Sequence, residues 1–255
     1  MKNKQRRELA VCGFAAVKAL EKKHPESITR FYYSSEHTKD FGSLCRYLAL
    51  RKVPYNQVEN SELEKLCDSV HHQGVVAMIE MPKIQRVTND VITEWMHNKE
   101  IVVLLDRVGN ANNLGAIARS AAFFGIKNII IPHDEAQTSV TTSTYRIAQG
   151  AIEDVKIYSV DSIFAFLSSM KDKMIRFGTD VKGKIPVSKM SSLCKKPVEK
   201  GAIIVLGNEE NGISNQVKKC SDYLVTIPTK QKLDTFDSLN VAQAASIIFY
   251  AISQQ

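Results

Sequence analysis

Several side chains that could take part in chemistry lie in a polar stretch at residues 106–125, directly after an apolar run. Arg119 comes four residues after Gly115, so the two share one face of a predicted helix for which Asn113 is the expected N-cap. An arginine can hold a phosphate by two parallel hydrogen bonds, and a glycine lets a ligand approach the backbone closely. Taken alone, the stretch fits an ordinary capped helix better than a functional site, because capped helices that contain an arginine are common.

Two further polar stretches follow apolar runs nearer the end of the chain. Gly207 and Gly212 bracket Glu209 directly after the run at 202–206, and the stretch 227–240 begins Ile-Pro-Thr and ends Ser-Leu-Asn before a helix rich in small residues. The first fits a turn with solvated acids and the second a helix cap. Neither stretch establishes a function by itself. Their interpretation depends on the strands and helices around them.

The elements that must position these stretches alternate between strands and helices. Strands such as Ile-Val-Val-Leu-Leu and Ala-Ile-Ile-Val-Leu are apolar on both faces, which predicts a parallel sheet covered by helices. Ligands of such sheets bind beyond the carboxyl ends of the strands. The loops after residues 105, 177, 206 and 227 are therefore the candidate binding loops. The expected strands are 101–105, 128–131, 155–160, 174–177, 202–206 and 224–227, and the expected helices are 114–124, 142–149, 162–170 and 239–252.

The first eighty residues form a separate α/β module in this interpretation. The spacing of apolar residues predicts a helix over 9–23, and the alternation that follows ends in an apolar strand at 74–81. Residues 83–99 are more polar and carry the only tryptophan, Trp95. We expect an α/β fold with two domains, residues 1–82 and 100–255, joined by a linker at 83–99.

Composition excludes several classes of protein. The chain has 255 residues, of which 44% are hydrophobic and 24% charged, and no apolar run approaches the ~20 residues that span a bilayer. The basic N-terminus lacks the apolar region of a secretory signal, and the five cysteines contain no CxxC pair. GxGxxG, P-loop, GxSxG and HExxH motifs are absent from the sequence. We therefore expect a cytoplasmic protein with neither a disulfide framework nor a metal site.

The net charge of +7 is concentrated in one region. Residues 171–200 hold nine basic and three acidic residues, a balance that suits a polyanion such as RNA and predicts binding that weakens with salt. A solvated lysine-rich surface explains the same balance. The basic residues are Lys171, Lys173, Arg176, Lys182, Lys184, Lys189, Lys195, Lys196 and Lys200.

Taken together, the three stretches carry a resemblance. The patterns N-x-G-A-I-x-R-x-A-x-x-F-G, G-x-E-x-x-G and I-P…S-L-N-V-A occur in this order, each after an apolar strand. They resemble the SpoU/TrmH family of S-adenosylmethionine-dependent RNA ribose 2′-O-methyltransferases, in the SPOUT superfamily. Residues 11–20 and 71–76 resemble that family's L30e-like substrate-binding domain. The resemblance covers both expected domains.

The resemblance implies a fold, a reaction and partners. It implies a deep trefoil knot in the C-terminal domain, a homodimer formed through that domain, S-adenosylmethionine as methyl donor and tRNA or rRNA as substrate. Arg119 then acts on the ribose 2′-hydroxyl, as a base or as a phosphate-binding and electrostatic group, and Glu209 orients Arg119 or Asn113. The segment between Pro228 and Ser238 is longer than the family's usual loop. The other implied catalytic residues are Asn113, Ser238 and Asn240, and the implied donor-binding residues are Thr179, Gly207, Ile227 and Leu239.

Two other functions fit part of the same pattern. A non-catalytic RNA-binding or ribosome-assembly factor would keep the fold and lose donor binding through the altered third loop. An RNA base methyltransferase would share the knot and the donor, but the three motifs match the ribose-modifying pattern. Donor binding and the position of the transferred methyl group separate these alternatives.

Overall fold

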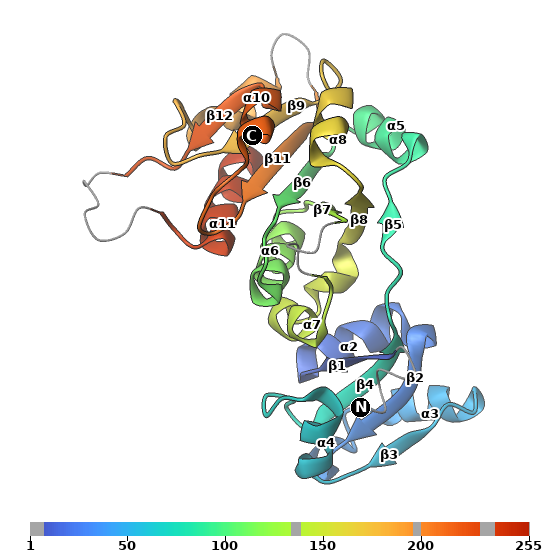
Figure 1. Cartoon of the computed structure of the whole chain (residues 1–255). Coiled ribbons are helices and arrows are strands. Elements are labelled where there is room, and N and C mark those ends of the chain that lie inside the picture. Colours follow the sequence, from blue (N-terminus) through green and yellow to red (C-terminus); the bar gives the residue numbers. More distant parts are fainter. Residues whose placement is uncertain (1–7, 134–138, 196–199, 230–237, 255) are drawn as a thin grey trace. The chain divides into compact units, whose positions relative to one another are not determined.

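The computed structural model describes residues 8–133, 139–195, 200–229 and 238–254. The chain folds as two compact units, one made of Met1–Lys83 with Ser139–Asp154 and the other of Ile84–Thr138 with Val155–Gln255 (Figure 1). Each unit has its own sheet, and the sheet of the second unit is parallel throughout. The expected α/β class is confirmed.

The first unit is built on a four-stranded sheet in the order β1-β4-β2-β3. β4 pairs antiparallel with β1 and β2, and β3 pairs parallel with β2. Helix α7 (Thr142–Ala148) packs against β1 although it is distant in sequence. The strands are β1 (Glu8–Cys12), β2 (Ile28–Tyr33), β3 (Tyr55–Gln57) and β4 (Val75–Glu80). The helices between successive strands are α2 (Phe14–Lys23), α3 (Gly42–Leu50) and α4 (Asn60–Cys67).

The expectation of one helix over 9–23 is wrong for its first five residues. Residues 8–12 form β1, which pairs with β4 from Glu8 opposite Glu80 to Cys12 opposite Val76. Gly13 then turns the chain at a φ of 100°, a conformation open to glycine, and α2 begins at the next residue. The short run Leu-Ala-Val-Cys is fully apolar, so its spacing does not distinguish a buried strand from a helix.

The second unit is built on an eight-stranded sheet in the order β10-β12-β9-β11-β6-β7-β8-β5. The chain runs from β6 through β7 to β8 on one side and then places β9, β11 and β12 on the other side. β11 lies between β6 and β9 and pairs with both. The strands are β5 (Gln85–Arg86), β6 (Ile101–Asp106), β7 (Asn128–Pro132), β8 (Lys156–Val160), β9 (Ile175–Thr179), β10 (Ile185–Pro186), β11 (Ala202–Gly207) and β12 (Tyr223–Thr226).

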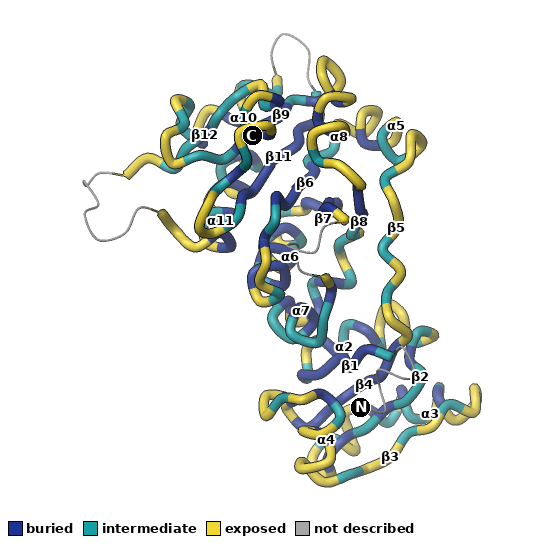
Figure 2. The backbone as a smooth tube through the Cα atoms, in the orientation of Figure 1, coloured by how far each residue is buried: buried dark blue, intermediate teal, exposed yellow. Residues whose placement is uncertain are grey.

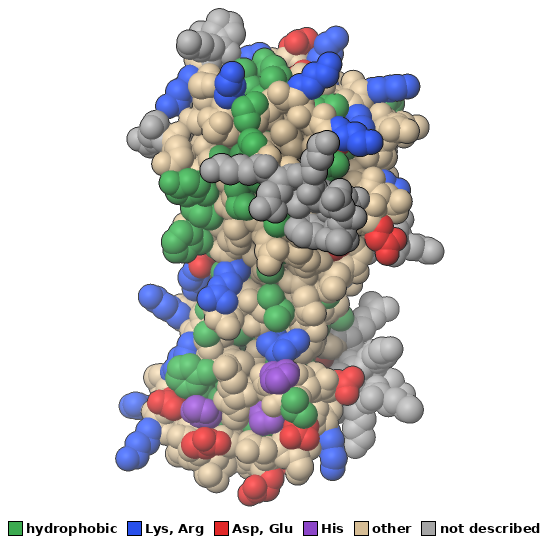
Figure 3. All heavy atoms as spheres, turned by 90° about the vertical axis from the view of Figure 1, so that its left-hand side faces the viewer, with side chains coloured by type: hydrophobic (Ala, Val, Ile, Leu, Met, Phe, Trp, Pro, Cys, Tyr) green, Lys and Arg blue, Asp and Glu red, His purple; other side chains and the backbone are tan. Residues whose placement is uncertain are grey.

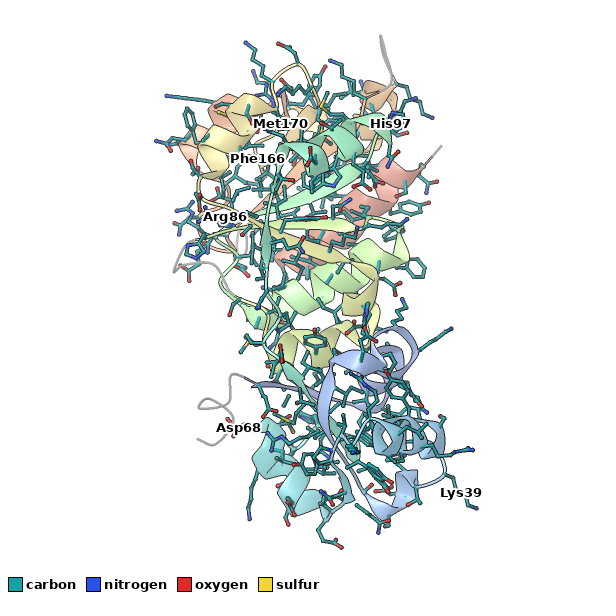
Figure 4. All side chains as sticks on the ribbon, turned by 90° about the vertical axis from the view of Figure 1, so that its right-hand side faces the viewer. Lys39, Asp68, Arg86, His97, Phe166 and Met170 are labelled. Atoms are coloured by element: carbon teal, nitrogen blue, oxygen red, sulfur yellow. The ribbon has the colours of Figure 1, made fainter. Side chains whose placement is uncertain are left out.

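Helices cover both faces of this sheet, so β7 and β11 are buried along their whole length and β6 is buried after its first residue (Figure 2). Trp95 of α5 (Asn89–His97) packs in one apolar core with side chains of α8 (Ile163–Ser169) and α10 (Asn215–Cys220). Figure 4 labels Phe166 and Met170, the α8 side of that core. Helix α11 (Val241–Ser253) packs on β11, on α9 (Met190–Cys194) and along α6 (Ala111–Phe123).

The order of the strands brings the candidate loops together. The carboxyl ends of β12, β9, β11 and β6 are neighbours along one edge, with Gly207 opposite Asp106 and Thr179 opposite Val225. Three loops that are distant in sequence therefore start side by side. Within the described ranges, no helix combines the length and the apolar character needed to cross a membrane.

Candidate active site

A hydrogen-bonded chain of three side chains joins the three predicted motifs. The Asn113 amide nitrogen donates to the Glu209 carboxylate, and the amide oxygen of Asn113 accepts from the Asn240 side chain at 3.2 Å. These residues come from α6, from the loop after β11 and from the start of α11. Asn113 is 9% exposed, so its partners are part of a site that positions it firmly.

Asn113 holds this central place because it is not the N-cap of its helix. The expected cap is wrong by three residues: the Asn110 side chain caps α6 by accepting from the Asn112 backbone N–H at 2.8 Å. Asn113 therefore lies in the first helical turn, with its amide free to bond across the site. Asn240 does cap α11, accepting from the Ala242 N–H at 2.9 Å while its nitrogen reaches Asn113.

Arg119 lies on the same helix and is exposed. Its guanidinium has no hydrogen-bond or ion-pair partner within the described part of the chain. Glu209, which the sequence assigned to orient either Arg119 or Asn113, contacts Asn113. The structure thus offers an arginine available to an anionic ligand and, separately, a fixed polar network one to two turns earlier on the same helix.

The second loop is a tight turn that leaves no room for a side chain at Gly207. A Cβ atom there would lie 2.3 Å from the main chain of Gly212 and of Ile213. Asn208 ties the turn together, because its side-chain oxygen accepts from the N–H groups of Glu210 and Asn211, both at 3.0 Å. Only main-chain groups are therefore present at position 207.

The remaining predicted residues lie on the same edge of the sheet. The Thr179 hydroxyl donates to the Val205 carbonyl at 2.9 Å, which ties the end of β9 to β11. Ile227 follows β12 and is half-buried, whereas Ser238 and Leu239 precede α11 and are exposed. The long segment predicted between Pro228 and Ser238 lies largely outside the described residues, because positions 230–237 are not among them.

Sequence reasoning missed two residues at the end of β6. Asp106 is almost fully buried, and its carboxylate accepts from the Ser214 backbone N–H at 2.8 Å and from Arg107 Nε at 2.9 Å. The Arg107 carbonyl in turn accepts from the Asn208 side chain at 3.0 Å. The sequence carried one indication of this pair, a charged dipeptide directly after an apolar strand.

The basic region at 171–200 is only partly available to a ligand. Arg176 is buried and binds Asp222, with Nε donating to the carboxylate at 3.0 Å. Burial opposes the ionisation of Asp222, but its hydrogen bonds with Arg176 hold the pKa of that carboxyl below its ordinary value. Lys200 donates to the Asp172 carbonyl at 2.6 Å. Lys196 lies outside the described residues.

Across the described ranges, no group of three or more histidine, cysteine, aspartate or glutamate side chains is arranged to hold a metal ion.

Sequence profiles match both parts of the chain. A profile described as SpoU rRNA Methylase family matches residues 100–250. The chain belongs to this family. A second profile, described as RNA 2′-O ribose methyltransferase substrate binding, matches residues 10–85. The SpoU family, and with it the methyltransferase class expected from the three motifs, are confirmed.

Individual relatives agree with the family. The chain is 26% identical over 250 residues to the 23S rRNA (guanosine-2′-O-)-methyltransferase RlmB of Nitrosomonas europaea, covering 96% of this chain and 91% of that one. It is 30% identical over 171 residues to an uncharacterized tRNA/rRNA methyltransferase of Haemophilus influenzae; the match covers 67% of this chain and 48% of the relative. In fold, it matches the SpoU methyltransferase AviRb of Streptomyces viridochromogenes in complex with AdoMet, with a TM-score of 0.77, 23% identity and coverage of 99% and 92%.

Proposed function

We propose that this SpoU family protein transfers a methyl group from S-adenosylmethionine to a ribose 2′-hydroxyl of rRNA or tRNA. The observation that carries the proposal is the side-chain network Glu209–Asn113–Asn240, which joins the three motif loops at one edge of a parallel sheet. The RlmB relative, named as a 23S rRNA guanosine-2′-O-methyltransferase, aligns over nearly the whole chain and supports the same reaction.

The residues of the site fit S-adenosylmethionine as the methyl donor. When bound, the donor supplies an electrophilic methyl group on a sulfonium sulfur. Gly207 offers main-chain groups without a side chain, Thr179 ends β9, and Ile227 and Leu239 lie between β12 and α11. We assign these four residues to donor binding. Backbone groups and apolar side chains of this kind suit an adenosine moiety.

Arg119 and the asparagine network act on the RNA side of the reaction. A guanidinium stays protonated near neutral pH, so Arg119 holds a phosphate and stabilises the negative charge that develops on the 2′-oxygen. Asn113, held by Glu209 and Asn240, positions the nucleotide, and Ser238 contributes its hydroxyl from the third loop. Most of the rate then comes from holding two substrates in contact rather than from acid–base chemistry.

A second copy of the chain completes the working protein in this proposal. Phe123 at the end of α6 is 83% exposed and Tyr250 on α11 is 56% exposed, and Phe124 packs against Tyr250 at 6.3 Å between ring centroids. Large aromatic side chains exposed together mark an association surface. Figure 3 shows hydrophobic side chains exposed over the upper part of one face of the molecule. We expect a homodimer formed through α6 and α11.

The two expected domains have different roles in this proposal. We propose that residues 1–82, most of which match the substrate-binding profile, hold the RNA, and that residues 100–255 carry the reaction within a knotted domain, with 83–99 as the connection. Since tRNA and rRNA are the expected substrates, we place the protein in the cytoplasm.

The test is the transfer of radiolabelled methyl groups from S-adenosylmethionine to tRNA and rRNA fractions of cells lacking the protein. We expect label in one fraction with the wild type and at least a hundredfold less with Arg119→Ala, whose melting temperature stays unchanged because Arg119 is exposed. Digestion to nucleosides then locates the methyl group. Label on a base, or no donor binding by the wild type, would refute the proposal.

A further inference from the structure

Two cationic residues with left-handed backbones flank β6. Arg107 follows its carboxyl end with a φ of 59°, and Lys99 precedes its amino end with a φ of 53°. Residues with a Cβ rarely adopt this conformation, and strain of this kind persists where the surroundings impose it, often at functional sites. Arg107 lies at the edge where the motif loops meet, whereas Lys99 lies at the opposite edge of the same sheet.

Contacts from Asp106 and from the loop after β11 fix Arg107 in place. Its carbonyl oxygen accepts from the side chain of Asn208, the residue before Glu209, at 3.0 Å. Its Nε donates to Asp106 at 2.9 Å, and the other Asp106 oxygen is held by the Ser214 N–H. Both the backbone and the plane of the guanidinium are therefore oriented by groups of the first two motifs.

The outer part of the guanidinium remains available. Among the described residues, neither Nη1 nor Nη2 of Arg107 has a hydrogen-bond partner, and the side chain is 37% exposed while that of Asp106 is 3% exposed. Asp106 is thus too buried to bind a ligand itself, and it orients Nε. A guanidinium with two free terminal nitrogens presents a planar fork that matches two oxygens of a phosphate.

We propose that Arg107 binds a backbone phosphate of the RNA substrate, beside the nucleotide that is methylated; this rests on the proposed function. The position of the residue favours RNA over the donor, whose carboxylate is the other anion in the reaction. The residues assigned to the donor come from the ends of β9 and β11 and from the segment after β12, whereas Arg107 precedes α6, the helix that carries Arg119. Two arginines, one directly before α6 and one on α6, then hold successive parts of one RNA strand.

A simpler role for Arg107 is to neutralise the buried Asp106. The two roles predict different RNA affinities for Arg107→Gly. If the residue binds phosphate, RNA affinity falls, whatever balance the relieved left-handed backbone and the lost contact with Asp106 give in the melting temperature. If it only neutralises Asp106, the melting temperature falls and RNA affinity is unchanged.

The experiment measures binding of fluorescently labelled bulk tRNA and bulk rRNA to the full-length protein over a series of KCl concentrations. Lys99→Gly is the matched control, because it removes one positive charge and one left-handed side chain at the other end of β6. For Arg107→Gly we expect affinity to fall about five- to tenfold and the slope of log affinity against log salt to fall by about 0.7–0.9, the loss of one phosphate contact. We expect Lys99→Gly to keep the wild-type slope, and S-adenosylmethionine affinity to be unchanged in both variants.

Three outcomes would overturn the inference. An unchanged slope with a lowered melting temperature would make Arg107 a structural partner of Asp106. Weakened donor binding with an unchanged RNA slope would assign it to the donor carboxylate. An equal decrease of the salt slope in Lys99→Gly would show that the effect comes from net charge rather than from a contact made by Arg107. Because the readout is binding, a wild type that fails to transfer methyl groups refutes the proposed function without affecting this test.

Discussion

Replacing Glu209 tests whether its hydrogen bond with Asn113 helps to position the RNA substrate. Glu209→Ala removes the acceptor for the Asn113 amide, which is buried and bonded on its other side to Asn240. Hydrogen bonds to charged groups contribute about 1.5–3 kcal/mol. If the whole loss appears as misplacement of Asn113 in the transition state, kcat/KM for RNA falls roughly 10- to 150-fold, at about 1.4 kcal/mol per factor of ten.

Glu209→Gln separates the position of the acceptor from its charge. The glutamine side-chain oxygen can still accept from Asn113, so only the difference between a charged and a neutral hydrogen bond is lost, about 1 kcal/mol, or roughly fivefold in rate. We expect kcat/KM for RNA to decrease in the order wild type, Glu209→Gln, Glu209→Ala in single-turnover methyl transfer at subsaturating RNA. The measurement also includes the double variant of Glu209→Ala and Asn113→Ala, which we expect to be about as slow as the slower single variant.

Three results would refute this reasoning. Wild-type rates in Glu209→Ala would show that the contact with Asn113 has no part in positioning the substrate. Equal losses in Glu209→Gln and Glu209→Ala would show that the carboxylate charge acts directly on the reaction or on Arg119. Additive losses in the double variant would lead to the same conclusion, since two residues that act through one contact are not additive.

Two further predictions follow from exposed and buried side chains. The double variant Phe123→Glu and Tyr250→Glu should elute as a monomer in light-scattering chromatography and lose at least tenfold in methyl transfer with unchanged circular dichroism, because both side chains are exposed in the single chain; a dimer that persists contradicts the assigned interface. Burial raises the pKa of Glu153, whose Oε1 lacks a partner among the described residues, so wild-type stability falls as the pH rises above the ordinary carboxyl pKa of about 4.3. Glu153→Gln should therefore exceed the wild type by about 1 kcal/mol in urea unfolding at pH 8 and lose that advantage near pH 4, and an advantage independent of pH would contradict this cause.

The sequence predicted the parallel sheet because its strands are apolar along both faces, a pattern that few other architectures produce. It failed where the pattern was short. Residues 9–12 are four apolar residues in a row, and only the pairing partner at 76–79, which is distant in sequence, makes them a strand. Likewise, helix α7 reads as part of the C-terminal domain in sequence, yet it packs against β1, a contact that local periodicity does not encode.

The sequence predicted which residues form the site better than it predicted the hydrogen bonds between them. The motif residues Asn113, Glu209 and Asn240 stood out by resemblance, but three asparagines at 110, 112 and 113 compete for the N-cap, and sequence does not decide which of them turns inward. The conformation of Arg107 was hidden for a related reason. Arg107 has a positive φ, and its carbonyl accepts from Asn208, about a hundred residues later in the chain, a contact that no local pattern encodes.

The place of β11 between β6 and β9 has a consequence for how the protein matures. β6 lacks its final neighbour on that side until β11 has been synthesised, and the contact between Asn113 and Asn240 closes across 127 residues. Contacts this distant form slowly, because the entropy of closing a long loop must be overcome before the contact stabilises anything. The three-motif site should therefore be among the last features to form during folding, and donor binding would report that the second unit has completed its fold.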